Sequence, residues 1–413
     1  MLDAADPCGN LSRLVSSAEG DRLRHSPSTL VQLLRYRAHS QPQDVAFVYL
    51  ADGENEQLRL TYEQLDRQAR AIGAWLASQG LAGQRALLLY PAGLDFIAGF
   101  FGCLYAGVIA VPAYPPRRNR SLARIQAIAD DAQAAVALTT GAVLQRVEGL
   151  IGDTPHLRRL RWLDVDRVPQ AMEARWKMPE IHGSTLAFLQ YTSGSTGTPN
   201  GVMLTHGNLL HNSAQIAYAF EQTRSCRGVF WLPSYHDMGL IGGILQPLYI
   251  GCPNVLMSPM TFLQKPLRWL SAISRFGGTI SGGPNFAYDL CVRKISPEQR
   301  KTLDLSTWRV AFNGAEPVQA ETLERFARTF APCGFRREAF YPCFGLAEAT
   351  LLVAGGYAFR PPVVRNFDGN ALAEGRVLAM ASGSETARPL VSSGQNLPDQ
   401  KIVIVDPQTC RAV

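Results

Sequence analysis

The chain has 413 residues, of which 46% are hydrophobic and 18% charged, and its formal net charge is +6. This composition can bury a large core, which excludes a globally disordered chain. The eight cysteines form no Cys-x-x-Cys pair and no Cys/His set with zinc-ligand spacing. Their pattern argues against a disulfide scaffold or a structural zinc module and favours a reducing, cytoplasmic compartment. No nucleic-acid-binding motif is present, so we expect no nucleic-acid partner.

Residues 1–27 are polar and weakly patterned, which predicts a leader before the folded part of the chain. From residue 28 on, apolar runs of strand length alternate with amphipathic stretches, which predicts an α/β fold with parallel sheets flanked by helices. One helix is expected after Thr61, whose capping box with Gln64 starts it, and Gly80 ends it. A second is expected over 266–276. The expected strands are 46–50, 86–90, 135–138, 186–191, 229–232, 255–257, 279–281 and 309–312.

The segment 96–114 carries no charge over 19 residues, which is close to the length that spans a bilayer. Three glycines and Pro112 interrupt it, and a strand-like run precedes it. Such runs also occur inside parallel α/β sheets. We therefore expect a buried helix over 95–106 and a buried strand over 108–111, and no integral membrane segment.

After about residue 355 the pattern changes to paired prolines and small residues. It predicts a smaller β-rich subdomain over 355–413, with a strand at 402–405 and a helix-like stretch at 371–380.

The strongest motif is Tyr191–Gly201 (YTSGSTGTPNG), which follows a predicted strand. Its glycines let the backbone curl, and its hydroxyl groups let N–H and O–H donors converge on an anion. The Gly-Lys-Ser/Thr of a Walker A loop is missing, so this is a different kind of phosphate-binding loop.

Four further motifs carry chemistry. In 231–243 (WLPSYHDMGLIGG), a histidine after a strand and a proline turn can donate to a carboxylate or acyl-phosphate oxygen. In 313–317 (NGAEP), a glycine turn follows a strand, where open α/β sheets bind ligands. In 341–350 (YPCFGLAEAT), an aromatic ring precedes a glutamate, a hard ligand for Mg²⁺. In 281–290 (SGGPNFAYDL), small residues and then aromatics suit the wall of an apolar tunnel.

Together these motifs resemble the fatty acyl-AMP ligases of the adenylate-forming superfamily, from about residue 28 to the last residue. Two positions depart from the superfamily pattern: Asn200 replaces the usual lysine of the phosphate loop, and Phe344 replaces a tyrosine. The loss of the lysine is common in fatty acyl-AMP ligases. Phenylalanine in place of tyrosine keeps an aromatic ring that can stack on adenine. The resemblance implies the large N-terminal domain of these enzymes, with two parallel-type sheets, while the C-terminal lid domain that the superfamily has is absent.

The resemblance also implies cofactors and residue roles. ATP and Mg²⁺ are the implied cofactors, with Glu348 as the metal ligand. The implied catalytic residues are His236, Thr192 and Glu348. The implied nucleotide-binding residues are Thr192, Ser193, Gly194, Ser195, Thr196, Gly197, Asn313, Gly314, Ala315, Glu316, Phe344, Gly345, Leu346 and Ala347. The implied substrate-binding residues are His236, Met238, Gly242, Gly283, Phe286 and Ala287.

The implied activity is ATP-dependent activation of a medium- or long-chain fatty acid to acyl-AMP, with release of pyrophosphate. The acyl group would pass to the phosphopantetheine arm of an acyl carrier protein. The 46 residues from Glu348 to Gly394 exceed the same interval in acyl-CoA synthetases, and the excess, about 361–385, resembles the insertion of fatty acyl-AMP ligases. In that family the insertion hinders the rotation of the C-terminal domain that coenzyme A requires. We expect Val363, Val364, Phe367 and Leu372 to hold it against the main domain.

Two alternatives remain open at this stage: an acyl-CoA synthetase, and a catalytically silent nucleotide- or lipid-binding module. The superfamily continues past the point that corresponds to Val413, with an aspartate for the ribose, a hinge and a lysine for the α-phosphate. Because phosphate chemistry depends on positioned positive charge, we expect this chain alone to be a truncated domain that binds adenylate weakly and reacts slowly.

Overall fold

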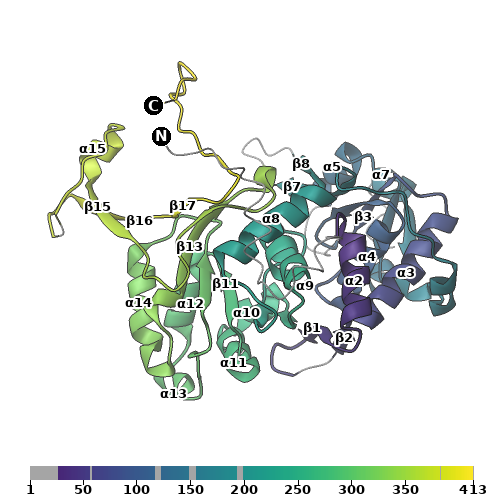
Figure 1. The fold of residues 1–413 in the computed structure, drawn as a ribbon, viewed down its shortest axis with the longest axis horizontal. Coiled ribbons are helices and arrows are strands. Elements are labelled where there is room, and N and C mark those ends of the chain that lie inside the picture. Colours follow the sequence, from purple (N-terminus) through teal and green to yellow (C-terminus); the bar gives the residue numbers. More distant parts are fainter. Residues whose placement is uncertain are drawn as a thin grey trace, which may run out of the picture.

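The computed structural model describes residues 27–55, 58–116, 122–147, 155–192, 199–381 and 383–412. Within these ranges the strands form three sheets, of nine, six and two strands. Helices cover the two larger sheets and also lie between them (Figure 1). The predicted α/β fold with helix-flanked, largely parallel sheets is therefore confirmed, and each predicted strand from 46 to 312 is present with its ends shifted by at most two residues.

The nine-stranded sheet has the order β17-β14-β13-β12-β11-β9-β10-β1-β2. Its six central strands, from β13 to β1, run parallel, while β2 at one edge and β14 and β17 at the other run antiparallel to their neighbours. The strands are β1 (Val45–Leu50), β2 (Leu58–Thr61), β9 (Gly228–Phe230), β10 (Asn254–Met257), β11 (Ile280–Gly283), β12 (Val310–Asn313), β13 (Phe340–Gly345), β14 (Leu352–Gly355) and β17 (Gln395–Asn396).

The six-stranded sheet has the order β6-β5-β3-β4-β7-β8, parallel except for the last pair. Its strands are β3 (Arg85–Leu88), β4 (Ile109–Pro112), β5 (Val136–Thr139), β6 (Arg161–Asp164), β7 (Leu186–Thr192) and β8 (Asn200–Thr205). Parallel strands bring their carboxyl ends to one edge of a sheet, which is where such folds bind ligands.

The α-helices of the described residues are α2 (Leu30–Ser40), α3 (Tyr62–Ser78), α4 (Leu94–Tyr105), α5 (Ala123–Asp131), α6 (Gly141–Val147), α7 (Pro155–Arg159), α8 (His206–Ala219), α9 (Gln246–Ile250), α10 (Pro259–Gln264), α11 (Leu267–Phe276), α12 (Asn285–Lys294), α13 (Pro297–Arg300), α14 (Ala320–Phe330) and α15 (Gly369–Ala373). A π-helix, η5 (Met238–Leu245), leads directly into α9. Short 3₁₀ turns are η3 (Val165–Arg167), η4 (Gln170–Arg175), η6 (Ala331–Cys333), η7 (Arg337–Ala339) and η8 (Ala347–Ala349).

The cores place η5 between the two large sheets. Leu240, Ile241 and Ile244 of η5 belong to the same buried cluster as Phe188 of β7. The opposite face of the nine-stranded sheet packs against α11, α12 and α14 in a second cluster rich in aromatic rings. In Figure 1, α8 and α9 accordingly lie in the middle of the molecule, and α12 and α14 lie along its outer side.

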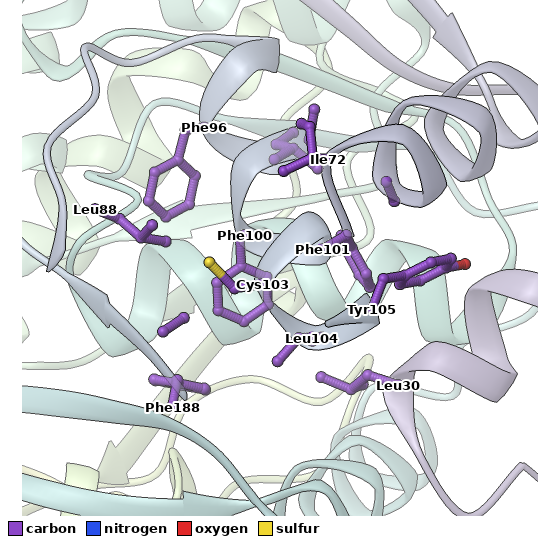
Figure 2. Packing of buried hydrophobic residues seen from close by; sticks show 14 of the residues in the cluster. Leu30, Ile72, Leu88, Phe96, Phe100, Phe101, Cys103, Leu104, Tyr105 and Phe188 are labelled. Carbon is purple, nitrogen blue, oxygen red and sulfur yellow. The ribbon is translucent and has the colours of Figure 1, made fainter. Parts of the chain in front are cut away.

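The uncharged segment 96–114 divides into α4 and β4, as predicted. Figure 2 shows Phe96, Phe100 and Phe101 of α4 among side chains from neighbouring elements, including Leu88 and Phe188. The Phe100 ring meets that of Phe188 edge to face, with 5.6 Å between their centroids. Across the residues that the structure describes, no helix combines the length and the apolar character needed to cross a membrane.

The helix predicted after Thr61 is α3. The Thr61 side chain accepts from the backbone N–H of Gln64, and the Gln64 side chain accepts from that of Thr61, so the capping box is complete. Gly80 follows the helix with φ +69°, the left-handed conformation that glycine adopts without steric cost.

The predicted insertion forms a two-stranded antiparallel sheet, β15 (Val364–Asp368) with β16 (Ala387–Val391). The helix predicted at 371–380 is wrong in extent: α15 covers only Gly369–Ala373, because a turn at Gly375 (φ +74°) ends it. Together with α15 the hairpin reaches away from the body of the molecule (Figure 1). Val363 is 55% exposed, whereas Val391 of β16 packs against the second core cluster.

The strand predicted at 402–405 is also wrong. Residues 402–404 have no regular structure, and Val405 forms one isolated bridge with Ala412. All four apolar side chains are between 47% and 68% exposed, so no partner strand or core in the described residues covers this run.

Candidate functional site

A cavity of about 300 Å³ lies between the two large sheets, next to the carboxyl ends of β7, β12 and β13. Of the residues predicted from the sequence, it brings together Thr192, His236, Met238, Gly242, Gly314, Ala315, Phe344, Gly345, Leu346, Ala347 and Glu348. These residues come from four separate motifs that are up to 156 positions apart in the chain. The remaining lining residues are mostly apolar and are described below.

The turn between β13 and β14 depends on a glycine. A Cβ added at Gly345 would lie 1.9 Å from the carbonyl oxygen of Leu351, so no other residue fits this bulged pairing without backbone movement. The backbone N–H of Leu346 donates to that same oxygen at 3.0 Å. Thr350 closes the turn at φ +76°, an uncommon value for a residue other than glycine. The tight turn fixes the direction of the residues on both sides of it.

Phe344 and Glu348 flank this turn, and both line the cavity. The Phe344 side chain is 51% exposed although it belongs to the central region of the sheet, so its ring offers an uncovered face. Glu348 lies in η8 and is exposed. An exposed carboxylate can ligate a divalent cation whose remaining ligands are water and phosphate oxygens, which is the usual mode for Mg²⁺.

The end of β12 lies against β13. A Cβ at Gly314 would lie 2.9 Å from the carbonyl oxygen of Cys343, so glycine permits this close approach. Ala315 follows with φ +68°, a strained value for alanine. Both residues line the cavity, whereas Asn313 is fully buried, and its side-chain oxygen has no hydrogen-bond partner within the described part of the chain.

His236 sits in the loop between β9 and η5, and its side chain is 54% exposed. Its Nδ1 lies 2.5 Å from Oδ1 of Asp237, which also accepts from the backbone N–H of Met238 at 2.6 Å. The hydrogen bond that the Asp237 carboxylate accepts from the ring raises the pKa of His236 above its ordinary value of 6.5, against the opposing effect of burial. Asp237 thus holds Nδ1 and leaves Nε2 as the ring nitrogen for a ligand.

Thr192 is the last residue of β7, and its carbonyl oxygen accepts from Nη2 of Arg124 at 3.2 Å. It lines the cavity at the start of the phosphate-loop motif. The predicted nucleotide-binding residues Ser193, Gly194, Ser195, Thr196 and Gly197 lie outside the described residues.

Some predicted site residues do not line this cavity. Glu316 accepts from the backbone N–H of Phe286 at 2.6 Å. A Cβ at Gly283 would lie 2.7 Å from the Trp231 ring, and the Phe286 ring packs edge to face on the same tryptophan at 6.2 Å. Ala287 is fully buried in the second core cluster. The tunnel wall predicted at 281–290 therefore packs against the core on the far side of β11, away from the cavity.

The apolar wall instead comes from residues that the sequence analysis did not single out. They are Ile216, Phe220, Phe230, Ile280, Phe312, Leu351 and Leu352. Two of them, Ile216 on α8 and Phe220 directly after its last residue, are four residues apart, a spacing that places them on one helix face. This spacing is the feature of the sequence that could have pointed to these two wall residues. It does not distinguish a pocket wall from ordinary helix packing.

The cavity thus combines two chemical environments. One end carries an exposed ring, a carboxylate and a histidine whose pKa is raised, grouped at strand ends. The other end is apolar. Such an arrangement suits a ligand that has an anionic, aromatic part joined to a hydrocarbon part.

Comparison with known proteins gives the family. Residues 34–413 match the model of the AMP-binding enzyme family. The chain is 47% identical over 390 residues to a medium-chain fatty-acid–[acyl-carrier-protein] ligase, JamA, of Moorena producens, covering 93% of this chain and 66% of that protein. The chain therefore spans less than two thirds of that relative.

Two solved structures match the fold. A fatty acyl-adenylate ligase from Legionella pneumophila, in complex with acyl adenylate and pyrophosphate, has a TM-score of 0.87 and 42% identity, over 93% of this chain and 66% of that one. A structure from work on fatty acyl-adenylate ligases of Escherichia coli and L. pneumophila has a TM-score of 0.86 and 32% identity. The match covers 94% of this chain and 70% of that one. The chain belongs to the AMP-binding enzyme family and, within it, to the fatty acyl-AMP ligases.

Proposed function

We propose that this chain is the part of an enzyme that binds ATP and a fatty acid and joins them as acyl-AMP. The observation that carries the proposal is the single cavity in which Phe344, Glu348 and His236 meet an apolar wall. The printed names of the relatives, a fatty-acid–[acyl-carrier-protein] ligase and a ligase bound to acyl adenylate, support it. They also support a medium- or long-chain acid as substrate and an acyl carrier protein as acceptor, whose phosphopantetheine thiol would take the acyl group.

In this reaction a carboxylate oxygen of the fatty acid attacks the α-phosphorus of ATP. The bond from that phosphorus to the bridging oxygen breaks, and pyrophosphate leaves. The attacking carboxylate is already an anion, so no protein nucleophile is needed, and the protein contributes position and charge. We assign adenine stacking to Phe344, approach of the purine to the Gly314–Ala315 backbone, and orientation of the reacting oxygens to His236.

Magnesium fits this site through Glu348, whose exposed carboxylate faces the cavity. No group of three or more His, Cys, Asp or Glu side chains within the described residues could hold a metal by itself. Mg²⁺ bound to ATP brings its own phosphate ligands, so one protein carboxylate is sufficient. The described cysteines are all free, which supports the cytoplasm as the proposed compartment.

Binding tests the proposal directly. We expect this chain to bind an octanoyl-AMP analogue, with a sulfamate in place of the phosphate, in isothermal titration calorimetry. Replacing Phe344 by Ala should weaken binding of both the analogue and AMP roughly tenfold, because base–aromatic stacking contributes about 1–3 kcal/mol. Phe286→Ala is the matched control: its ring is 41% exposed but does not line the cavity, so AMP binding should not change.

Product analysis separates the proposal from an acyl-CoA synthetase. Octanoate-dependent exchange of pyrophosphate into ATP reports adenylation, and chromatography with and without coenzyme A identifies the product. Accumulated octanoyl-AMP supports the proposal, and efficient formation of octanoyl-CoA contradicts it. If the chain bound neither AMP nor the analogue, the proposed site itself would be wrong.

The pH dependence of binding tests the role of His236. A raised pKa means that the imidazolium persists to a higher pH, so its attraction for an anionic ligand is full below the ordinary value of 6.5 and is lost as the pH rises through the raised value. In Asp237→Asn the carboxylate that raises the pKa is gone. We expect the loss of analogue binding to begin at a lower pH in this variant. Identical midpoints in both proteins would show that His236 does not contact the ligand's charge.

A further inference from the structure

A second cavity, of about 250 Å³, lies outside the site described above. Its walls are the loop that follows β1, the residue after α10 and one side of α11. It shares no lining residue with the first cavity. Because α11 packs on the face of the nine-stranded sheet opposite η5, this second cavity lies on the far side of that sheet from the proposed acyl-adenylate site (Figure 1).

The charges that line the second cavity do not balance. Lys265, Arg268 and Arg275 line it together with a single carboxylate, that of Glu54. Nζ of Lys265 and Nε of Arg268 donate to the same oxygen, Oε1 of Glu54, at 2.7 and 3.1 Å, so two positive charges are held side by side. Their hydrogen bonds lower the pKa of Glu54. Three cationic groups against one carboxylate leave an excess of two positive charges.

The third cation, Arg275, is also held in place. Its Nη1 donates to the backbone carbonyl oxygen of Glu54 at 2.7 Å, and its Cζ lies 4.9 Å from the centroid of the Phe276 ring. Arg268 and Arg275 are seven residues apart on α11, a spacing that places them on one helix face, with Ser271 between them. Each of the three cations keeps N–H groups that have no acceptor in the described part of the chain.

The loop after β1 is shaped to approach α11 closely. A Cβ added at Gly53, which has φ +77°, would lie 2.8 Å from Cδ of Arg268, so a larger residue would push the loop and the helix apart. Oδ1 of Asp52 accepts from the backbone N–H of Glu54 at 2.9 Å and closes the turn. The Asp52 carboxylate does not line the cavity, so Glu54 alone opposes the three cations there.

An excess of two positive charges favours a dianion over a monoanion. A phosphate monoester carries a charge of about −1.5 to −2 at pH 7 and has three strong acceptor oxygens, which suit a group of unused cationic donors. A carboxylate carries one charge and has two oxygens. Leu50, Leu267 and Phe276 add an apolar part to the same wall, which can contact the organic group of an ester.

We propose that this second cavity binds a phosphate monoester, with Lys265, Arg268 and Arg275 around the phosphate group and the apolar wall against the organic group. Glu54 repels the phosphate and so limits the affinity. The inference does not depend on the proposed function, because the two cavities have separate lining residues.

Phenyl phosphate and benzoate are matched probes, because they share a ring and differ in their charge and acceptor oxygens. Calorimetry at about pH 8 and low ionic strength measures both on the unmodified chain. The first cavity is filled beforehand with the octanoyl-AMP analogue, which has no phosphate group. We expect phenyl phosphate to bind roughly tenfold more tightly than benzoate, and added salt to weaken its binding by screening. Equal binding of the two probes would overturn the proposal.

Single substitutions locate the bound phosphate. Lys265→Gln and Arg275→Gln each remove one positive charge and should weaken binding of phenyl phosphate about threefold to tenfold. Glu54→Gln removes the opposing charge and should tighten binding by a similar factor, a gain that a misfolded protein cannot give. Arg328→Gln is the matched control, because this exposed arginine of α14 does not line the cavity.

The pattern across these variants decides the proposal. If Lys265→Gln, Arg275→Gln and Glu54→Gln all bound phenyl phosphate like Arg328→Gln, the phosphate would bind elsewhere and the inference would be wrong. Failure of the octanoyl-AMP analogue to bind would contradict the proposed function alone, because the variants of the second cavity are read out with phenyl phosphate.

Discussion

Replacing Asp66 by Ala should lower the free energy of unfolding by about 3 kcal/mol. Asp66 is 2% exposed on α3, and its Oδ2 lies 2.6 Å from Nη1 of Arg35 and 2.9 Å from Nε of Arg70. The hydroxyl of Tyr105 donates to Oδ1 at 2.7 Å. The carboxylate thus joins α2, α3 and α4. Removing one partner of a buried pair costs about 3–5 kcal/mol, and we expect the low end because Arg35, 43% exposed, can turn to water.

A surface ion pair supplies the matched control for Asp66. Glu324 pairs with Arg337, and the two side chains are 51% and 34% exposed. Glu324→Ala should change the free energy of unfolding by less than about 1 kcal/mol. Urea unfolding, analysed by linear extrapolation, measures both variants. Asp66→Asn, which keeps a hydrogen-bond acceptor for Tyr105, should fall between them. If Asp66→Ala and Glu324→Ala lowered the free energy of unfolding equally, the buried network would have no structural role.

Asp66 also shows where sequence patterns stop being informative. The 3.6-residue pattern around Leu65, Ala69 and Ile72 predicts α3 and its buried face, and that face is buried. A charge next to these positions looks like the edge of the polar face. Arg70 is a local partner on α3, but Arg35 and Tyr105 come from α2 and α4, and no local pattern reveals which helices will meet.

The side of the cavity that we assign to the nucleotide follows from local features. Glycine turns at strand ends, a histidine after a proline turn and an aromatic–glycine–glutamate string each constrain a few neighbouring residues. Parallel pairing then brings strand ends together, so Gly314, Phe344 and Glu348 meet in one cavity. The prediction depended on short motifs, which the sequence contains directly, and on their resemblance to the motifs of fatty acyl-AMP ligases.

The apolar side could not be predicted in the same way. Phe286 and Ala287 have the expected residue types, yet they face Trp231 and the second core. Ile216, Phe220 and Phe312 line the cavity, although each has the character of an ordinary core residue. Which apolar face borders a cavity depends on how η5 sits between the sheets, and that is a property of tertiary packing.

Replacing Gly242 by Phe should weaken acyl binding strongly and leave nucleotide binding intact. Gly242 lines the cavity between Met238 and Gln246, and a Cβ placed there would lie 3.4 Å from Cδ2 of Leu351, at ordinary contact distance. A phenyl ring would extend past this contact into the space that we assign to the hydrocarbon chain. Forcing the acyl chain and the phenyl ring into the same space should cost about 1–3 kcal/mol of binding free energy. The octanoyl-AMP analogue should therefore bind up to about a hundredfold more weakly.

Two alanine variants and AMP itself decide whether this loss comes from the pocket. Gly242→Ala should be tolerated, with a larger penalty for longer acyl chains than for shorter ones. Gly243→Ala controls for the helix, because Gly243 does not line the cavity and its added Cβ would lie 3.6 Å from the Phe230 ring. AMP should bind all of these proteins within about twofold of the wild type, because Phe344 and Gly314 are unchanged. If Gly242→Phe weakened AMP as much as the analogue, η5 would have moved as a whole. If it weakened neither, the hydrocarbon chain must lie elsewhere, since a ring at this position cannot share the cavity with it.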